Sequence, residues 1–355
     1  MIIIGGDIVK ALVYAGPGKR EVREVEKPRI LNDGDAIIKL TKTTICGTDL
    51  HILGGDVPAC KEGTILGHEG IGIVEEVGSG VKHFKVGDKV IISCVTACGV
   101  CDYCKIALYA HCKDGGWILG HLIDGTQAEY VHIPHADNSL YHIPKGMSDD
   151  AAVMISDILP TGFEIGVLNG QVSPGDTIAI IGAGPIGMSV LFTSQFYSPA
   201  TIIMVDLDEN RLAEAKRFGA THTINSKDAD ADIKEIIEIT GGRGVDVAIE
   251  AVGYPATFDI CQKILAPGGH LANVGVHGKP VDLQLQDLWI RNVTITTGLV
   301  STNTIPMLLK TLVNGKIPIE DLVTHNFTFD NISEAYDTFK NAAKEKALKI
   351  IIDFK

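Results

Sequence analysis

The sequence has 355 residues, enough for two domains that each bury a hydrophobic core without help from disulfides. It carries 31 basic and 44 acidic side chains, a formal charge of -13, and has no Lys/Arg-rich run, which argues against nucleic acid or a membrane as a partner. No apolar run reaches membrane-spanning length, and residues 1–4 are too short for a signal peptide core. We therefore expect a cytoplasmic protein whose eight cysteines stay reduced.

The first 150 residues are predicted to be rich in strands and poor in helices. Turn signals containing Gly and Asp separate the predicted strands, which are 10–14, 35–40, 71–77 and 89–93. After about Met154 strands alternate with helices, which is typical of a parallel sheet covered by helices. The predicted strands there are 177–181, 201–205, 245–250 and 270–274, and the predicted helices are 187–195, 209–218 and 233–240. The tail after Thr297 is too short for a domain and is expected to rejoin the first one.

A glycine-rich turn, Gly182-Ala183-Gly184-Pro185-Ile186-Gly187, lies between a predicted strand and a predicted helix. Its glycines allow a tight turn and close approach of the backbone to a pyrophosphate, whose charge the helix N-terminus favours. The next predicted strand ends at Asp206, which would bind the adenosine ribose hydroxyls and repel a 2'-phosphate. The pattern therefore favours NAD over NADP, although Arg211 could contact the ribose region or compensate for a phosphate. A tight turn that binds no ligand is the less favoured interpretation.

Four cysteines are close enough in sequence to surround one tetrahedral zinc ion: Cys98, Cys101, Cys104 and Cys112. A redox pair formed by Cys98 and Cys101 is the alternative, but it leaves the other two thiols unexplained. Four sulfur ligands leave no position for a substrate, so we expect this zinc to be structural.

Cys46 and His68 indicate a second, open metal site. The segment from Cys46 to His51 supplies a thiolate, the hydroxyl of Thr48 and an imidazole, and Gly67-His68-Glu69 adds an imidazole and a carboxylate. A lone cysteine or histidine in a core is usually only packed there. Thiolate, imidazole and carboxylate within 25 residues are instead the groups that bind zinc and carry away the proton of an alcohol.

Together these motifs resemble those of the zinc-dependent medium-chain alcohol dehydrogenases. The resemblance also includes Gly70 and Gly72 and the segment from Asp157 to Gly162, and it covers almost the whole chain. It implies an α/β protein with a Rossmann, doubly wound parallel-sheet domain and a strand-rich GroES-like catalytic domain. The implied boundaries are 1–155 for the catalytic domain with a structural zinc lobe at 94–113, 156–297 for the NAD-binding domain, and 298–355 for the return to the catalytic domain.

The resemblance also implies roles for single residues. Cys46, His68 and Asp157 match the ligands of the catalytic zinc, although many relatives have a cysteine in the place of Asp157. Cys94 is a nearby competing thiolate. Glu69 matches a carboxylate behind the ligands that approaches the metal in some relatives.

Four further positions follow from the same resemblance. Thr48 and His51 match a proton relay, in which the histidine, with a reference pKa of about 6.5, exchanges the proton with solvent. Cys94 and Trp117 match positions that line the substrate pocket, where a tryptophan favours small or slender alcohols. The remaining His121, His132 and His135 are expected at the surface or in turns.

We thus expect an enzyme with two zinc ions per chain that interconverts alcohols with aldehydes or ketones by hydride transfer to and from NAD. The main alternative is a polyol or amino-alcohol dehydrogenase, of sorbitol or threonine type, with the same fold. A non-catalytic structural protein that binds zinc and NAD is less favoured, because it would not need an intact open site. Microbial relatives of this length imply a homo-oligomer, in particular a tetramer.

Overall fold

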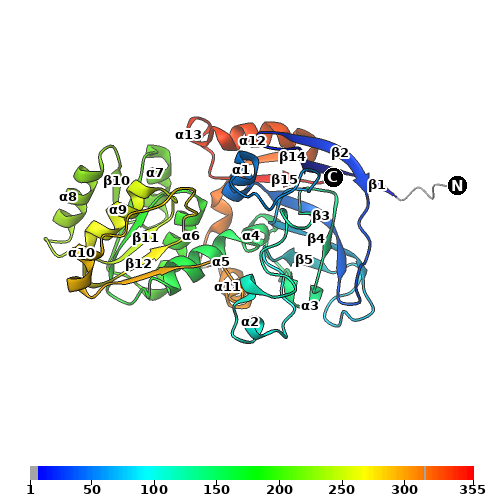
Figure 1. Ribbon diagram of the computed structural model, residues 1–355, viewed down its shortest axis with the longest axis horizontal. Coiled ribbons are helices and arrows are strands. Elements are labelled where there is room, and N and C mark those ends of the chain that lie inside the picture. Colours follow the sequence, from blue (N-terminus) through cyan, green and yellow to red (C-terminus); the bar gives the residue numbers. More distant parts are fainter. Residues whose placement is uncertain (1–6, 316) are drawn as a thin grey trace. The chain divides into compact units, whose positions relative to one another are not determined.

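The computed structural model describes residues 7–315 and 317–355, which form two compact units (Figure 1). The first unit runs to Asp157 and resumes with Ser301–Lys355, and the second is Ile158–Val300. Residues 1–4, which we expect not to form a signal peptide, lie outside the described residues. Within the described ranges, no helix is both long and apolar enough to cross a membrane.

A seven-stranded sheet forms the centre of the first unit. Six strands follow the order β14-β15-β3-β4-β5-β7, and β6 pairs with β3 beside this path. Their bounds are β3 (Ala36–Thr44), β4 (Gly70–Val77), β5 (Lys89–Ile92), β6 (Tyr130–Ile133), β7 (Leu140–His142), β14 (Val323–Thr328) and β15 (Lys349–Asp353). A separate hairpin consists of β1 (Ile8–Tyr14) and β2 (Arg20–Glu26). Because β15 pairs antiparallel with β3, the C-terminal segment completes a sheet that begins near the N-terminus.

One hydrophobic core in this unit joins both ends of the chain. Leu12 and Leu66 from the N-terminal part pack in the same cluster as Tyr336 and Ile350 from the C-terminal part. Burying each large apolar side chain contributes about 1.5–3 kcal/mol. The segment between β3 and β4, which carries Cys46, His68 and Glu69, therefore rests on a core that the C-terminal segment completes.

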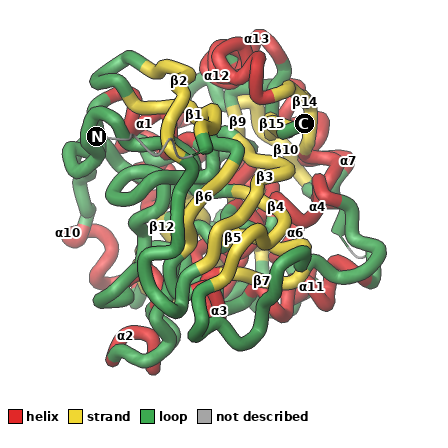
Figure 2. Tube along the Cα trace, turned by 90° about the vertical axis from the view of Figure 1, so that its right-hand side faces the viewer, coloured by secondary structure: helices red, strands yellow, loops and turns green. Residues whose placement is uncertain are grey.

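The helices of the first unit are short, and much of the chain between β5 and β6 is loop (Figure 2). They are α1 (Gly47–Gly54), α2 (Asp102–Lys105), α3 (Ala136–Ser139), α4 (Asp149–Met154), α11 (Ile305–Val313), α12 (Ile332–Lys340) and α13 (Ala342–Glu345). The sequence does not predict α1. It begins after Cys46 because the Asp49 carboxylate accepts the backbone N–H of Cys46 at 2.9 Å, the return bond of a capping box.

The second unit contains a six-stranded parallel sheet in the order β10-β9-β8-β11-β12-β13. Counted within this unit the order is 3-2-1-4-5-6, which is that of the Rossmann fold. The strands are β8 (Thr177–Ile181), β9 (Thr201–Asp206), β10 (His222–Asn225), β11 (Val245–Glu250), β12 (Leu265–Asn273) and β13 (Thr294–Thr297). The helices are α5 (Ile158–Thr161), a π-helix (Gly162–Leu168), α6 (Pro185–Ser194), α7 (Glu209–Arg217), α8 (Ala229–Ile239), α9 (Pro255–Ile264) and α10 (Leu285–Leu288). The expected α/β fold class is confirmed.

Candidate active site and metal centres

Cys46, His68, Glu69 and Asp157 come together in the first unit. Each offers one ligand atom, and these four atoms lie within 4.8 Å of one another. His68 Nε2 is 3.3 Å and Cys46 Sγ is 3.8 Å from Oδ2 of Asp157. One sulfur, one imidazole nitrogen and carboxylate oxygen are the donor types of a catalytic zinc site.

Local backbone geometry positions the two central donors. Cys46 caps α1, and His68 follows Gly67, whose φ of +92° is favoured only by glycine. A β-carbon at Gly67 would also collide with the side chains of Thr126 and Gln127. Gly67 therefore serves both the turn and the close packing that place His68 in the group.

The electrostatics of the group favour a cation at its centre. Burial alone lowers the pKa of His68, but the contacts with Asp157 and Cys46 raise it well above its usual value. Burial also raises the pKa of Glu69, and Oε2 of this carboxylate has no hydrogen-bond partner among the described residues. A buried, unpartnered oxygen beside a thiol and an imidazole is the environment that a divalent cation satisfies. The four residues therefore fit zinc.

Two buried side chains support this group, although the sequence motifs assign them no role. Asp49 Oδ1 lies 3.7 Å from Nδ1 of His68, the ring nitrogen on the side away from Asp157. Lys349 is 1% exposed, and its Nζ donates to Glu69 Oε1 at 2.7 Å. Burial alone would lower the pKa of Lys349, but the attraction of Glu69 outweighs it, so the pKa is raised. A lysine in the otherwise apolar stretch 348–352 is the signal that could have revealed this pair.

The predicted relay residues lie in different surroundings. Thr48 Oγ1 is 3.8 Å from Cys46 Sγ, next to the metal group. His51 is not part of that group: its side chain is 39% exposed, and its Nδ1 lies 2.9 Å from Oδ2 of Asp56. The sequence gives Asp56 no role, yet it holds one ring nitrogen of His51.

The predicted pocket residues are placed in the same unit. Cys94 is buried, and its Sγ lies 3.5 Å from Oδ1 of Asp157. Trp117 is half-buried and stacks on His121 with ring centroids 4.1 Å apart. His121 lies in a turn, as expected, but it is not at the surface, because it is only 4% exposed. The loop that carries it packs closely on Gly67, since a β-carbon at Gly120 would overlap the Gly67 carbonyl.

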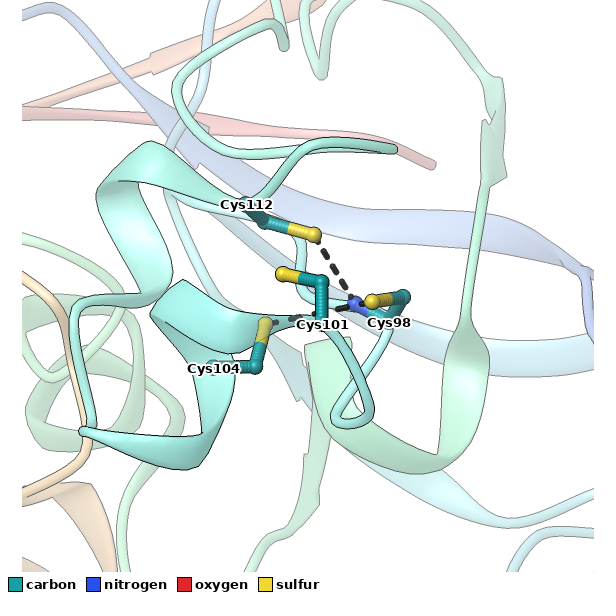
Figure 3. A group of neighbouring side chains, drawn as sticks. All are labelled: Cys98, Cys101, Cys104 and Cys112. Atoms are coloured by element: carbon teal, nitrogen blue, oxygen red, sulfur yellow. Dashed lines mark hydrogen bonds between the residues drawn. The ribbon is translucent and has the colours of Figure 1, made fainter.

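The four lobe cysteines also converge. Figure 3 shows their sulfur atoms turned toward one another, from α2 and the turns on either side of it. The four sulfurs lie within 4.8 Å of one another, and all four cysteines are free thiols. Backbone hydrogen bonds from Lys113 and Cys104 lower the pKa of Cys101 to about 6, which favours the thiolate form that binds a metal ion. This arrangement fits a closed tetrahedral zinc better than a redox pair.

The glycine turn lies in the second unit, between β8 and α6. Gly182 has a φ of +109°, and its carbonyl is so close to Gly187 that a β-carbon there would overlap it. At Gly184, by contrast, a β-carbon would meet only Arg211 within 4 Å. The turn thus combines a tight bend with an open backbone at the start of a ten-residue helix, which fits a bound pyrophosphate.

Asp206 ends β9, the neighbour of β8. Its Oδ2 accepts the backbone N–H of Ala183 at 2.6 Å, and its Oδ1 accepts that of Asp208 at 2.9 Å. The carboxylate therefore ties the glycine turn to the adjacent strand. Arg211 is close to the same turn, and its Nε lies 4.0 Å from Asp208 Oδ2.

Comparison with known proteins gives matches over nearly the whole chain. Residues 32–145 match the alcohol dehydrogenase GroES-like domain, and residues 173–314 match the zinc-binding dehydrogenase domain. An alcohol dehydrogenase of Cupriavidus necator is 36% identical, covering 97% of this chain and 98% of that protein. The apo structure of zinc dependent alcohol dehydrogenase 2 from Streptococcus pneumonia is 61% identical, with a TM-score of 0.94 and coverage of 98% and 99%. A protein of E. coli CFT073 named short chain alcohol dehydrogenase, solved with NADH, is 27% identical, with a TM-score of 0.88 and coverage of 98% and 100%.

Proposed function

The chain belongs to the zinc-binding medium-chain alcohol dehydrogenases, and from this membership we propose that it interconverts simple alcohols with aldehydes or ketones, using NAD as the hydride carrier. The observation that supports this most directly is the buried group of Cys46, His68, Glu69 and Asp157. When bound there, zinc polarises the substrate oxygen and lowers the pKa of a hydroxyl. The four cysteines of the lobe would hold the second, structural zinc.

Thr48 and His51 would handle the substrate proton. The Thr48 hydroxyl can both accept and donate, and it lies beside the Cys46 sulfur. His51 is partly exposed and can exchange a proton with solvent. With a proton on Nδ1 facing Asp56, its Nε2 is the nitrogen left to accept. Thr48 thus supplies a proton-transfer group beside the metal ligands, and His51 supplies one that is accessible to solvent.

The preference for NAD rests on Asp206 and the glycine turn. A carboxylate at the end of β9 suits the two ribose hydroxyls and repels a 2'-phosphate. Arg211 beside the turn is the group that would soften this preference. We therefore expect activity with NADP to be measurable but lower.

The decisive experiment follows reduced nicotinamide absorbance with short primary, branched, secondary and polyhydroxy alcohols, with NAD and NADP in parallel. Zinc-loaded protein should carry two metal ions per chain and oxidise simple alcohols with NAD, and Trp117 should favour slender ones. Activity restricted to polyols or amino alcohols would show that the enzyme is a polyol or amino-alcohol dehydrogenase and not one for simple alcohols. A zinc-loaded protein that reduces neither cofactor would contradict the proposal.

We also propose that the chain assembles with copies of itself, as a tetramer. The strand β13 is at the edge of its sheet, and the nearby Trp289 and Ile290 are 71% and 68% exposed. An open strand edge and exposed large apolar side chains are typical of an interface. Light scattering after size exclusion should give four times the chain mass of 37.9 kDa, whereas a monomer would contradict assembly.

A further inference from the structure

A buried chain of hydrogen bonds leads from Tyr336 on α12 to Asp49, which faces the metal ligand His68. Tyr336 Oη donates to Gln127 Oε1 at 2.8 Å, and Gln127 Nε2 lies 3.2 Å from Asp49 Oδ2. Asp49 then faces His68 through its other oxygen. All four side chains are at most 4% exposed, so water does not compete for these bonds.

The chemistry of the partners fixes the direction of this chain. Besides Asp49, Gln127 Nε2 also contacts the carbonyl of Thr44 at 3.1 Å. A carbonyl and a carboxylate only accept, so Gln127 must turn its NH2 group toward them and its oxygen toward Tyr336. Burial raises the pKa of Tyr336 well above its usual value, so its hydroxyl keeps the proton that it donates. A flipped amide would place two acceptors against each other in a buried site, which is costly.

As a result, the two oxygens of the Asp49 carboxylate have different partners. Its Oδ2 takes two donors, Gln127 Nε2 and the backbone N–H of Cys46. Its Oδ1 has no hydrogen-bond partner in the part of the chain described and is left for His68 Nδ1. A histidine ligand is held in place when its second ring nitrogen donates to a carboxylate.

Tyr336 is itself held from the other side. The Arg20 guanidinium lies over its ring, 4.8 Å from the centroid. Nη2 of Arg20 donates to the carbonyl of Ser333 at 3.0 Å and to Asp337 at 2.8 Å, both on α12. Arg20 thus contacts both the ring of Tyr336 and the helix that carries it, which fixes the position of the Tyr336 hydroxyl.

We propose that Gln127, fixed by Tyr336, is a positioning residue for the catalytic metal site, because it orients the Asp49 carboxylate that supports His68 and Cys46. The helix α12, in the C-terminal segment that returns to the first unit, thereby controls how long the catalytic metal is retained. This inference rests on the proposed zinc site.

Zinc release into excess chelator, followed with a colorimetric metal indicator, tests the inference. Tyr336→Phe removes only the hydroxyl, and Tyr14→Phe is the matched control, a buried tyrosine of the same hydrophobic cluster outside the hydrogen-bond chain. The Cys46→Ala variant identifies which release phase belongs to the catalytic site. We expect Tyr336→Phe to accelerate zinc release from the catalytic site about fivefold, the factor that corresponds to the loss of one neutral hydrogen bond. Zinc release from the cysteine lobe should be unchanged. Gln127→Met should accelerate release from the catalytic site by about tenfold or more.

The visible spectrum of the cobalt-substituted protein provides a second readout, because its bands report ligand geometry and not stability. Tyr336→Phe should shift the bands of the catalytic cobalt, whereas Tyr14→Phe should not. Equal release rates and equal spectra in Tyr336→Phe, Gln127→Met and Tyr14→Phe would overturn the inference. A wild-type protein that holds one metal ion would instead contradict the proposed function.

Discussion

At the scale of single residues, the buried pair of Lys349 and Glu69 is the most demanding interaction beside the metal group. Both side chains are 1% exposed, and Glu69 Oε2 lacks a hydrogen-bond partner among the residues the structure covers. A charge removed from water without a partner costs several kcal/mol, so each member of the pair requires the other. The pair also places a positive charge behind the ligands, which limits how far Glu69 can move.

Lys349→Met is expected to lower the free energy of unfolding by about 3 kcal/mol, because it leaves the Glu69 carboxylate buried without its cation. Urea unfolding followed by circular dichroism, at equal metal loading, measures the loss. The double variant Lys349→Met/Glu69→Gln should recover part of it, since no charge is then left unpaired. Equal losses in the single and double variants would refute this account.

Sequence motifs identify residues whose type and spacing alone indicate metal binding, such as Cys46, His68 and the four lobe cysteines. They do not identify Gln127 or Tyr336, because both lie in polar stretches, 124–130 and 333–338, where nothing in the sequence indicates a buried side chain or its partner. Gln127 is 209 residues from the tyrosine it bonds, and only the folded unit brings the two together. His121 is expected at the surface or in a turn, and it lies in a turn that is nevertheless buried, which the sequence alone does not indicate.

At the scale of elements, Asp35 connects the turn before β3 to β6. It is 1% exposed, and it accepts bonds from the backbone of Asn32 at 2.9 Å and from His132 Nε2 at 2.8 Å. Burial alone raises the pKa of Asp35, but the bonds from His132 and Asn32 outweigh it and lower the pKa. A folded-state pKa below the unfolded value means that the ionised form stabilises the fold. This contribution is complete above the ordinary pKa and is lost as the pH falls through the folded value.

Asp35→Asn should therefore lower the free energy of unfolding by about 1.5–3 kcal/mol at pH 7, the usual contribution of hydrogen bonds to a charged group. The difference from wild type should narrow as the pH falls below about 4, where aspartate is protonated in the unfolded chain. Urea unfolding of both proteins over a pH series gives this comparison. If the difference in free energy of unfolding between the two proteins grew as the pH fell, the ionised form of Asp35 would not be the one that stabilises the fold.

The lobe around α2 depends on its metal, because its cluster of buried side chains is only Ala97, Cys104 and Cys112. Cys104→Ala should reduce the zinc content from two ions to one per chain and loosen the lobe, so that trypsin cleaves after Lys105, whose side chain is already exposed. Metal analysis and limited proteolysis measure both effects. Cys60→Ala, which removes a buried thiol elsewhere in the same unit, is the control and should keep both ions. An unchanged proteolysis pattern in Cys104→Ala would show that packing alone orders the lobe.

Apolar runs made the buried strands predictable, and β8 and β11 have the predicted bounds. The strand β2, with sequence REVREVE, was missed because its residues are mostly charged and exposed, so no period-two apolar face marks it. Helix α1 was missed as well, because it has eight residues and its start depends on the Asp49 cap. The sequence therefore predicts elements that bury a face and fails for elements that local polar contacts define.

At the scale of the whole molecule, the candidate metal site lies in the first unit and the candidate cofactor site lies in the second. The grouped ligands Cys46, His68, Glu69 and Asp157 all belong to the first unit, in which Asp157 is the last residue before the chain enters the second. The glycine turn and Asp206 belong to the second unit, which has its own core of residues such as Ile181 and Val205. Because each site is built within one unit, each should be removable while the other remains.

Cys46→Ala should therefore lose one of two zinc ions and the oxidation of alcohols, yet bind NAD with the wild-type affinity. Calorimetric titration with NAD, together with metal analysis, measures the two properties in the same sample. Asp206→Ala is the reciprocal variant: it should keep both zinc ions and bind NAD about tenfold more weakly, because the turn loses the carboxylate that accepts the Ala183 N–H. Loss of NAD binding in Cys46→Ala would mean that the metal site is required to build the cofactor site. Turnover in a Cys46→Ala protein without the catalytic metal would remove zinc from the reaction altogether.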